Sequence, residues 1–215
     1  MKKLFVLITC CLPLAWAAAQ VTDLKQVYDK GATQVVNRTA GSFSENTKAG
    51  IRIGEAAGEG LVLLKDKTFS NGTIEVDLKG QDVFQKSFLG IAFHVANDST
   101  YDAVYFRPFN FRAADSVRRI HAVQYISHPQ FPWQRLREER NAQYEKAVRP
   151  VPDSNEWFHA RIEVGEKDIR VFVNDAQAPS LQVQKLNSRT GGGVALWTGD
   201  GSGGSFANLV VKEVK

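Results

Sequence analysis

The sequence contains almost no cysteine, and this absence limits how the protein can be stabilised. Only Cys10 and Cys11 carry thiols, so no disulfide can link positions beyond them. Hydrophobic residues make up 43% and charged residues 23% of the 215 residues, which is typical of a folded globular protein and excludes a long disordered or fibrous chain. The fold must therefore be held by a hydrophobic core.

An excess of one charge is also lacking. The sequence has 27 basic and 23 acidic side chains, a formal net charge of +4, and the two signs are interspersed along the chain. Binding to nucleic acid or to an anionic membrane surface needs a basic patch, and the sequence shows none. We therefore expect neither of these partners.

Metal-ligand spacing is absent as well. The histidines are His94, His121, His128 and His159, and no two of them stand at a His-x-His or His-x-x-x-His spacing. No dense Asp/Asn loop of the calcium-binding kind occurs, and the glycine-rich residues 199–204 lack the Gly-Lys-Ser/Thr ending of a phosphate-binding loop. The sequence therefore predicts no metal site and no cofactor.

The N-terminus has the pattern of an export signal. A basic start at residues 1–3 is followed by an apolar stretch over residues 4–15 and by a small-x-small pattern that ends at Ala19. We expect a signal peptide over residues 1–19, a single domain over residues 20–215, and a bacterial periplasmic or extracellular location. A membrane anchor is the alternative, but the apolar stretch is short for a membrane span.

Beyond residue 50 the apolar residues recur at every second position in short runs, separated by Gly, Asn, Asp or Pro. This pattern predicts an all-β fold, a two-sheet antiparallel sandwich of roughly ten to twelve strands with a jelly-roll connection. Residues 20–50 are weakly patterned and are expected to form an edge strand and loops. The predicted strands cover residues 60–65, 72–79, 88–96, 101–107, 121–127, 157–164, 168–174, 180–183, 193–198 and 206–214, with a meander over 157–183.

One stretch breaks the strand pattern. Residues 133–147 contain no Gly or Pro, Trp133 and Leu136 recur at helical spacing, and Arg135 and Glu139 are placed for an i,i+4 pair. Because prolines flank the stretch on both sides, we expect one short helical or loop insertion between two strands. Insertions of this length on a compact sandwich more often have a function than none. We therefore expect this insertion to lie near the ligand-binding groove.

Several of the predicted strands have a distinctive sequence, among them Phe69-Ser-Asn-Gly-Thr-Ile-Glu-Val-Asp77, Trp157-Phe-His-Ala-Arg-Ile162 and Gly193-Val-Ala-Leu-Trp197. Together these segments resemble the concanavalin A-like lectin/glucanase superfamily. Within the superfamily the chain is similar to laminin-G-like domains and to the bacterial 3-keto-disaccharide hydrolases. The resemblance implies a jelly roll that handles glycans on its concave face or rim, and the hydrolases imply cleavage of oxidised disaccharides. The chain departs from the hydrolases in its early segment, which lacks a Trp.

Glycosidases of this superfamily often carry a Glu-x-Asp-x-Glu strand, whose three carboxylates share one face. Glu75 and Asp77 match the first two positions here, but Lys79 occupies the third. A retaining mechanism needs a protonated carboxyl beside an ionised one. We therefore expect this strand to be a solvent-facing edge and assign no catalytic residue.

A binding face is predicted from strand alternation. If the apolar positions of residues 101–107 point into the core, Tyr105 and Arg107 point outward together. A guanidinium beside a phenol suits a polyhydroxylated ligand, since Arg donates in a fixed fork and Tyr offers a flat face and a hydroxyl. The alternative is a surface ion pair of Arg107 with Asp102 or Asp115.

Two hypotheses for the function follow. The first is an exported carbohydrate-active protein that binds a (keto-)disaccharide or another glycan on the concave face and either hydrolyses it or only binds it. The second is a non-catalytic laminin-G-like binding or adhesion module. For the first, exposed Trp side chains supply apolar platforms for sugar rings. The expected saccharide-binding residues are His94, Tyr105, Arg107, Tyr125, His128, Trp133, Arg137 and Trp197.

Overall fold

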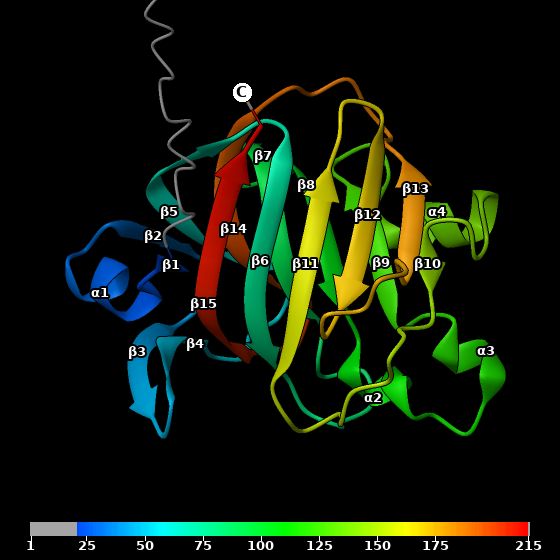
Figure 1. Cartoon of the computed structure of the whole chain (residues 1–215), viewed down its shortest axis with the longest axis horizontal. Helices are drawn as coiled ribbons and strands as arrows, with labels where there is room; N and C mark the ends of the chain where they lie inside the picture. The colour runs from blue at the N-terminus through cyan, green and yellow to red at the C-terminus, as the bar shows by residue number, and fades with distance from the viewer. Residues whose placement is uncertain (1–20, 215) are drawn as a thin grey trace, which may run out of the picture.

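The computed structural model describes residues 21–214, which form two antiparallel sheets packed face to face (Figure 1). The front sheet in that view has the strand order β13 (Leu181–Gln184), β12 (Asp168–Val173), β11 (Phe158–Val164), β6 (Gly72–Lys79), β15 (Gly204–Glu213), β4 (Lys48–Ile53) and β3 (Ala40–Glu45), and β1 (Val21–Thr22) also pairs with β15. The predicted export signal lies outside the described residues.

The rear sheet has the order β10 (Glu145–Lys146), β9 (Val123–Ser127), β8 (Thr100–Phe106), β7 (Leu89–Asn97), β14 (Gly192–Thr198), β5 (Gly60–Phe69) and β2 (Thr33–Val36). Within residues 21–214, four short helices connect or cover the strands, namely α1 (Leu24–Asp29), α2 (Pro108–Phe111), α3 (Ser116–Arg119) and α4 (Trp133–Glu139). The predicted all-β sandwich is confirmed, and so is the meander β11–β12–β13.

Period-two alternation decides which side chains fill the space between the sheets. In β6, Ile74, Val76 and Leu78 are fully buried against the rear sheet, whose β8 contributes Val104 and Phe106. Burial of apolar side chains contributes about 1.5–3 kcal/mol each. This shared core accounts for stability without disulfides.

The rear sheet is buried on its outer face as well. A second apolar cluster covers that face, with Tyr105 from β8, Ile126 from β9, Trp197 from β14 and Leu136 from α4. The predicted insertion is therefore confirmed as a helix that lies on the rear sheet, and its C-terminal end adds β10 to the sheet edge. The insertion thus both covers the sheet and completes it.

The expectation for residues 20–50 was right about an edge strand but missed most of the regular structure. This segment contains α1 and the strands β1 to β4. Helix α1 begins where Asp23 Oδ1 accepts a hydrogen bond from Gln26 N at 3.0 Å. The strands β2 and β3 lie at sheet edges and expose many side chains, so they lack the clear alternation of half-buried central strands.

The outer face of β6 carries a polar cluster instead of a catalytic dyad. Asp77 contacts Lys48, accepts from Asn208 Nδ2 at 2.6 Å, and lies 2.8 Å from His159 Nδ1, while Glu75 pairs with Lys212 at 2.8 Å. Burial raises the pKa of Asp77, but these contacts outweigh it and lower the pKa to about 2. A carboxyl held ionised in this way does not serve as a general acid.

Candidate functional site

A cavity of about 570 Å³ opens on the outer face of the rear sheet and is called here the rear-sheet cavity. Its floor is formed by β8 and β14, and its walls come from the loop before β7, from α2 and α3, and from α4. The lining residues are Glu59, Phe84, Gln85, Phe88, Tyr105, Arg107, Phe109, Asn110, Arg118, His121, Trp133, Gln134, Arg137, Trp197, Gly199 and Asp200.

Tyr105 and Arg107 form the floor, as strand alternation predicts. Arg107 Nη2 donates to Tyr105 Oη at 2.6 Å, and Tyr105 Oη donates to Gln124 Oε1 at 2.7 Å. The rings of Tyr105 and Trp197 lie 4.7 Å apart at their centroids. Burial raises the pKa of Tyr105 to about 12, so its hydroxyl stays protonated and able to donate.

Arg107 is held in place by a buried ion pair. Its Nη1 lies 3.3 Å from Glu145 Oε2, and Arg107 and Glu145 are 4% and 2% exposed at their side chains. The same carboxylate oxygen lies 3.2 Å from Arg137 Nη2 and 2.7 Å from His121 Nδ1. The alternative partners expected for Arg107 were therefore wrong: Glu145 of β10 is its partner, and Asp115 instead caps α3 by accepting from Val117 N.

Two carboxylates, those of Glu59 and Asp200, also line the cavity. Glu59 accepts a hydrogen bond from Tyr101 Oη, and His128 Nε2 lies 3.3 Å from Glu59 Oε1. Burial raises the pKa of Glu59, but its contacts with His128, Tyr101 and Trp197 outweigh burial and keep the pKa below its ordinary value. Asp200 Oδ1 accepts from the backbone N–H of Gly58 at 2.6 Å.

The cavity brings together Tyr105, Arg107, Trp133, Arg137 and Trp197, all of which were expected at the site. Trp133 is 37% exposed and Trp197 is 3% exposed, so the former stands at the mouth and the latter in the floor. His128 does not line the cavity but contacts Glu59, which does.

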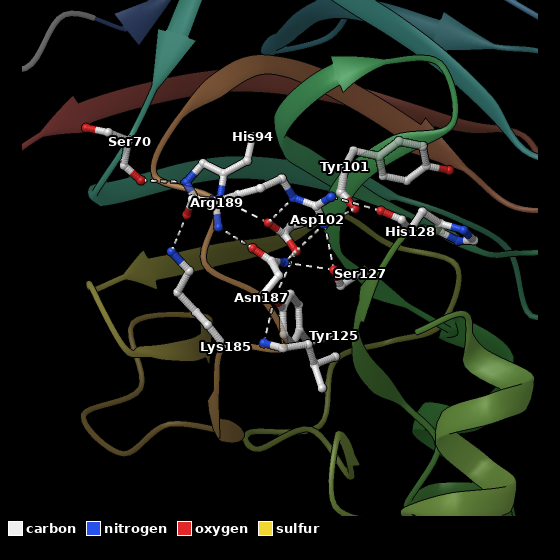
Figure 2. A network of polar contacts seen from close by, with 11 residues as sticks. Ser70, His94, Tyr101, Asp102, Tyr125, Ser127, His128, Lys185, Asn187 and Arg189 are labelled. Atoms are coloured by element: carbon white, nitrogen blue, oxygen red, sulfur yellow. Dashed lines mark hydrogen bonds and ion pairs between the residues drawn. The ribbon is translucent and has the colours of Figure 1, made fainter. Parts of the chain in front are cut away.

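His94 and Tyr125 lie elsewhere, in a buried network around Asp102 (Figure 2). Asp102 Oδ2 lies 3.0 Å from His94 Nδ1, Asp102 Oδ1 accepts from Tyr125 Oη at 2.9 Å, and Arg189 Nη2 lies 3.2 Å from Oδ1. The other ring nitrogen of His94, Nε2, donates to the backbone oxygen of Ser70 at 2.7 Å. Both side chains therefore serve the interior of the fold.

The placement of His94 on the concave face was wrong because a β-bulge interrupts β7. The register with β8 shifts between Phe93 and Asn97, and His94 itself has a φ of 50°. One extra residue reverses the face to which the following side chains point. Tyr125 needs no such irregularity, since alternation in β9 turns it into the core with Val123.

Several cavity residues were not expected from the sequence, notably Glu59, Phe84, Arg118 and Asp200. They come from loops or from the short α3, where alternation gives no information about direction. The aromatic content of the loop before β7 was an available signal, because large apolar side chains in a polar loop indicate a covered or ligand-bearing surface. Phe84 is 58% exposed.

Within residues 21–214, no group of three or more His, Asp or Glu side chains is placed to hold a metal ion. No helix there is both long and apolar enough to cross a membrane.

No family model and no curated protein matches the chain, so the comparisons rest on solved structures. The carbohydrate binding module CBM66 from Bacillus subtilis is similar at a TM-score of 0.59 and 16% identity over 83% of this chain and 93% of that one. A Bacillus subtilis protein of unknown function with a galectin-like fold is similar at a TM-score of 0.56 and 9% identity, over 90% of this chain and 97% of that one.

A putative glycosyl hydrolase from Parabacteroides distasonis is also similar, at a TM-score of 0.52 and 13% identity, over 86% of this chain and 89% of that chain. At these identities the likeness shows the fold alone, a jelly-roll sandwich, and the predicted fold is therefore confirmed. No comparison identifies a family for the chain.

Proposed function

We propose that this protein is an exported carbohydrate-binding protein that holds an oligosaccharide in the rear-sheet cavity. The observation that carries the proposal is the composition of the cavity, which combines aromatic surfaces with planar donors and acceptors. Its volume of about 570 Å³ falls within the range of about 300–1,000 Å³ that small-ligand sites occupy. The signal pattern of residues 1–19 supports a periplasmic or extracellular location.

The aromatic surfaces are placed as sugar platforms. Trp133 and Phe84 are exposed at the mouth, and Phe88, Phe109 and Trp197 continue the apolar lining inward. A sugar ring presents a face of C–H groups to such a surface, while its hydroxyls need fixed polar partners. The guanidinium, amide and carboxylate groups of the same cavity meet that need.

The similar structures support a saccharide as ligand. One of them is described as a carbohydrate binding module and another as a putative glycosyl hydrolase. The proposal extends that chemistry to this chain because its own cavity has the matching residues, and not from the fold alone.

Binding is favoured over hydrolysis by the state of the carboxylates. A glycosidase needs one carboxyl protonated and one ionised, both beside the scissile bond. Glu59 is surrounded by donors that keep its pKa below the ordinary value, so it is ionised at neutral pH and does not act as the acid. The other cavity carboxylate, Asp200, accepts a hydrogen bond from the backbone N–H of Gly58.

Replacing Trp133 by alanine is expected to weaken saccharide binding on the order of tenfold, because an exposed stacking surface is lost. The free energy of unfolding should change by less than about 1 kcal/mol, since the side chain is partly solvent-exposed. A glycan array of disaccharides, their 3-keto forms and longer oligosaccharides identifies the ligand, and calorimetric titration compares the variants.

Trp157→Ala is the matched control for this prediction. Trp157 lies beside the front sheet, where it stacks on Phe43 at 6.0 Å, and does not line the rear-sheet cavity. Its removal should leave the dissociation constant unchanged. Wild-type affinity in Trp133→Ala would place the site elsewhere, and release of product from a bound disaccharide would show hydrolysis in place of simple binding.

A further inference from the structure

Three guanidinium groups, those of Arg107, Arg118 and Arg137, line the rear-sheet cavity. Arg107 is already fully engaged at its terminal nitrogens. Nη1 donates to His121 O and Glu145, and Nη2 donates to Tyr105 Oη and Gln124 Oε1. It therefore forms part of the floor and has little capacity left for a ligand.

Arg118 and Arg137 have donors to spare. Arg118 donates from Nε to Asn110 Oδ1 at 3.3 Å and from Nη2 to Phe109 O at 3.0 Å, and Arg137 reaches Glu145 through Nε and Nη2. Within residues 21–214, Nη1 of either arginine has no hydrogen-bond or ion-pair partner. A guanidinium carries five N–H donors, so each has unused capacity.

Within residues 21–214 these three arginines have few carboxylate partners. Glu145 is a single carboxylate shared by Arg107 and Arg137, and the acceptors of Arg118 are a neutral amide and a backbone carbonyl. The cavity carboxylates Glu59 and Asp200 are bound elsewhere, Glu59 to Tyr101 Oη of β8 and Asp200 to the backbone N–H of Gly58. Among residues 21–214, Glu145 is therefore the one carboxylate that forms ion pairs with these three arginines.

Both arginines lie over exposed aromatic rings. The guanidinium carbon of Arg137 lies 5.0 Å from the centroid of Trp133, and that of Arg118 lies 4.5 Å from the centroid of Phe84. Stacking fixes the plane of a guanidinium and leaves its edge for a planar partner. A carboxylate is the planar anion that an arginine edge binds in a bidentate manner.

We propose that the ligand of this cavity is an acidic saccharide, a uronate-bearing oligosaccharide whose carboxylate is bound by Arg118 and Arg137. This inference rests on the proposed saccharide-binding function and names the class of sugar. The sugar ring that bears the carboxylate would lie between the aromatic surfaces of Phe84 and Trp133, beside the two arginines.

Trigalacturonate and its methyl ester provide a matched pair of probes, because they share one skeleton and differ in charge. Calorimetric titration of the full chain should show at least about tenfold tighter binding of the acid form. Arg118→Gln and Arg137→Gln should each weaken binding of trigalacturonate by about tenfold or more and leave binding of the methyl ester nearly unchanged. Added salt should weaken the binding of trigalacturonate to the wild type but not that of the methyl ester.

Arg135→Gln and Arg112→Gln serve as controls for lost positive charge. Arg135 pairs with Glu139 and Arg112 with Asp153 at exposed positions, and neither lines the cavity. These variants should bind trigalacturonate as wild type does, and thermal melts of all four variants establish that each is folded.

The outcomes separate this inference from the function on which it rests. Equal affinity for trigalacturonate and its methyl ester would contradict an acidic ligand but would still support a saccharide site. Binding of a sulfated disaccharide such as neocarrabiose 4-sulfate, without binding of trigalacturonate, would contradict the assignment of a carboxylate as the recognised group. Absence of binding to every sugar of a glycan array would overturn the saccharide function itself.

Discussion

Replacing Asp102 by asparagine is expected to lower the free energy of unfolding by about 3–5 kcal/mol. The Asp102 side chain is 0% exposed, and its two oxygens face His94, Tyr125, Asn187 and Arg189. An asparagine keeps the shape but removes the negative charge, and its amide nitrogen cannot accept the hydrogen bonds that one carboxylate oxygen accepted. Arg189 would be left without its counter-charge.

The network around Asp102 ties distant parts of the chain together. Arg189 and Asn187 lie in the connection from β13 of the front sheet to β14 of the rear sheet. From there Arg189 also donates to Ser127 Oγ at 2.6 Å and to the backbone oxygen of His128 at 2.9 Å (Figure 2). Loss of the carboxylate thus loosens both the crossing segment and the support of His128.

Chemical denaturation of the wild type and of Asp102→Asn measures this effect directly. Asp153→Asn is the matched control, since Asp153 pairs with Arg112 at 2.9 Å on the surface, and its removal should cost less than about 1 kcal/mol. If Asp102→Asn loses no more stability than the control, the network does not stabilise the fold.

The same carboxylate gives the stability of the fold an acid limit. Burial raises the pKa of Asp102, but contacts with His94 and Arg189 outweigh it and hold the pKa below its ordinary value of 3.8. Because the folded pKa is depressed, the contribution to stability is present above about pH 3.8 and is lost as the pH falls through the lower folded value. The free energy of unfolding of Asp102→Asn should therefore fall less steeply at acidic pH than that of the wild type.

Replacing Arg107 by alanine is expected to lower the free energy of unfolding by about 3 kcal/mol and also to weaken ligand binding. Arg107 is buried, and without it Glu145 keeps only Arg137 and His121 as partners. Tyr105 and Gln124 lose a donor at the same time. The effect on binding follows indirectly, because these groups form the floor of the cavity.

Arg137→Ala separates the two effects. Its side chain is 37% exposed and shares the same Glu145 carboxylate, so its loss should cost less than about 1 kcal/mol of stability while still weakening binding. Denaturation curves and calorimetric titrations of both variants provide the comparison. A normal denaturation curve for Arg107→Ala would contradict the buried ion pair.

Much of the fold could be predicted from the sequence because central strands obey simple alternation. The predicted strand at residues 72–79 corresponds to β6, and the outward pairing of Tyr105 with Arg107 is present at the end of β8. In both strands one face must pack on the opposite sheet, so a local pattern determines the direction of each side chain.

The rest of the site depends on contacts that no local pattern encodes. Glu145 reaches Arg107 across 38 positions of the sequence, and Glu59 and Asp200 enter the cavity from separate loops. His94 was misplaced because a bulge, which depends on the neighbouring strands, reversed its direction. Alternation alone predicts which face a side chain takes, but not which loops fold over that face.

The tryptophans allow one direct test of the claim that saccharides bind in the rear-sheet cavity. Trp133 and Trp197 line that cavity, whereas Trp157 lies beside the front sheet. In protein labelled with 5-fluorotryptophan, fluorine NMR resolves these side chains, each assigned through its Trp→Phe variant. On addition of trigalacturonate or of the sugar that binds best on the array, the resonances of Trp133 and Trp197 should shift while that of Trp157 stays unchanged. A shift confined to Trp157 would contradict the proposed site.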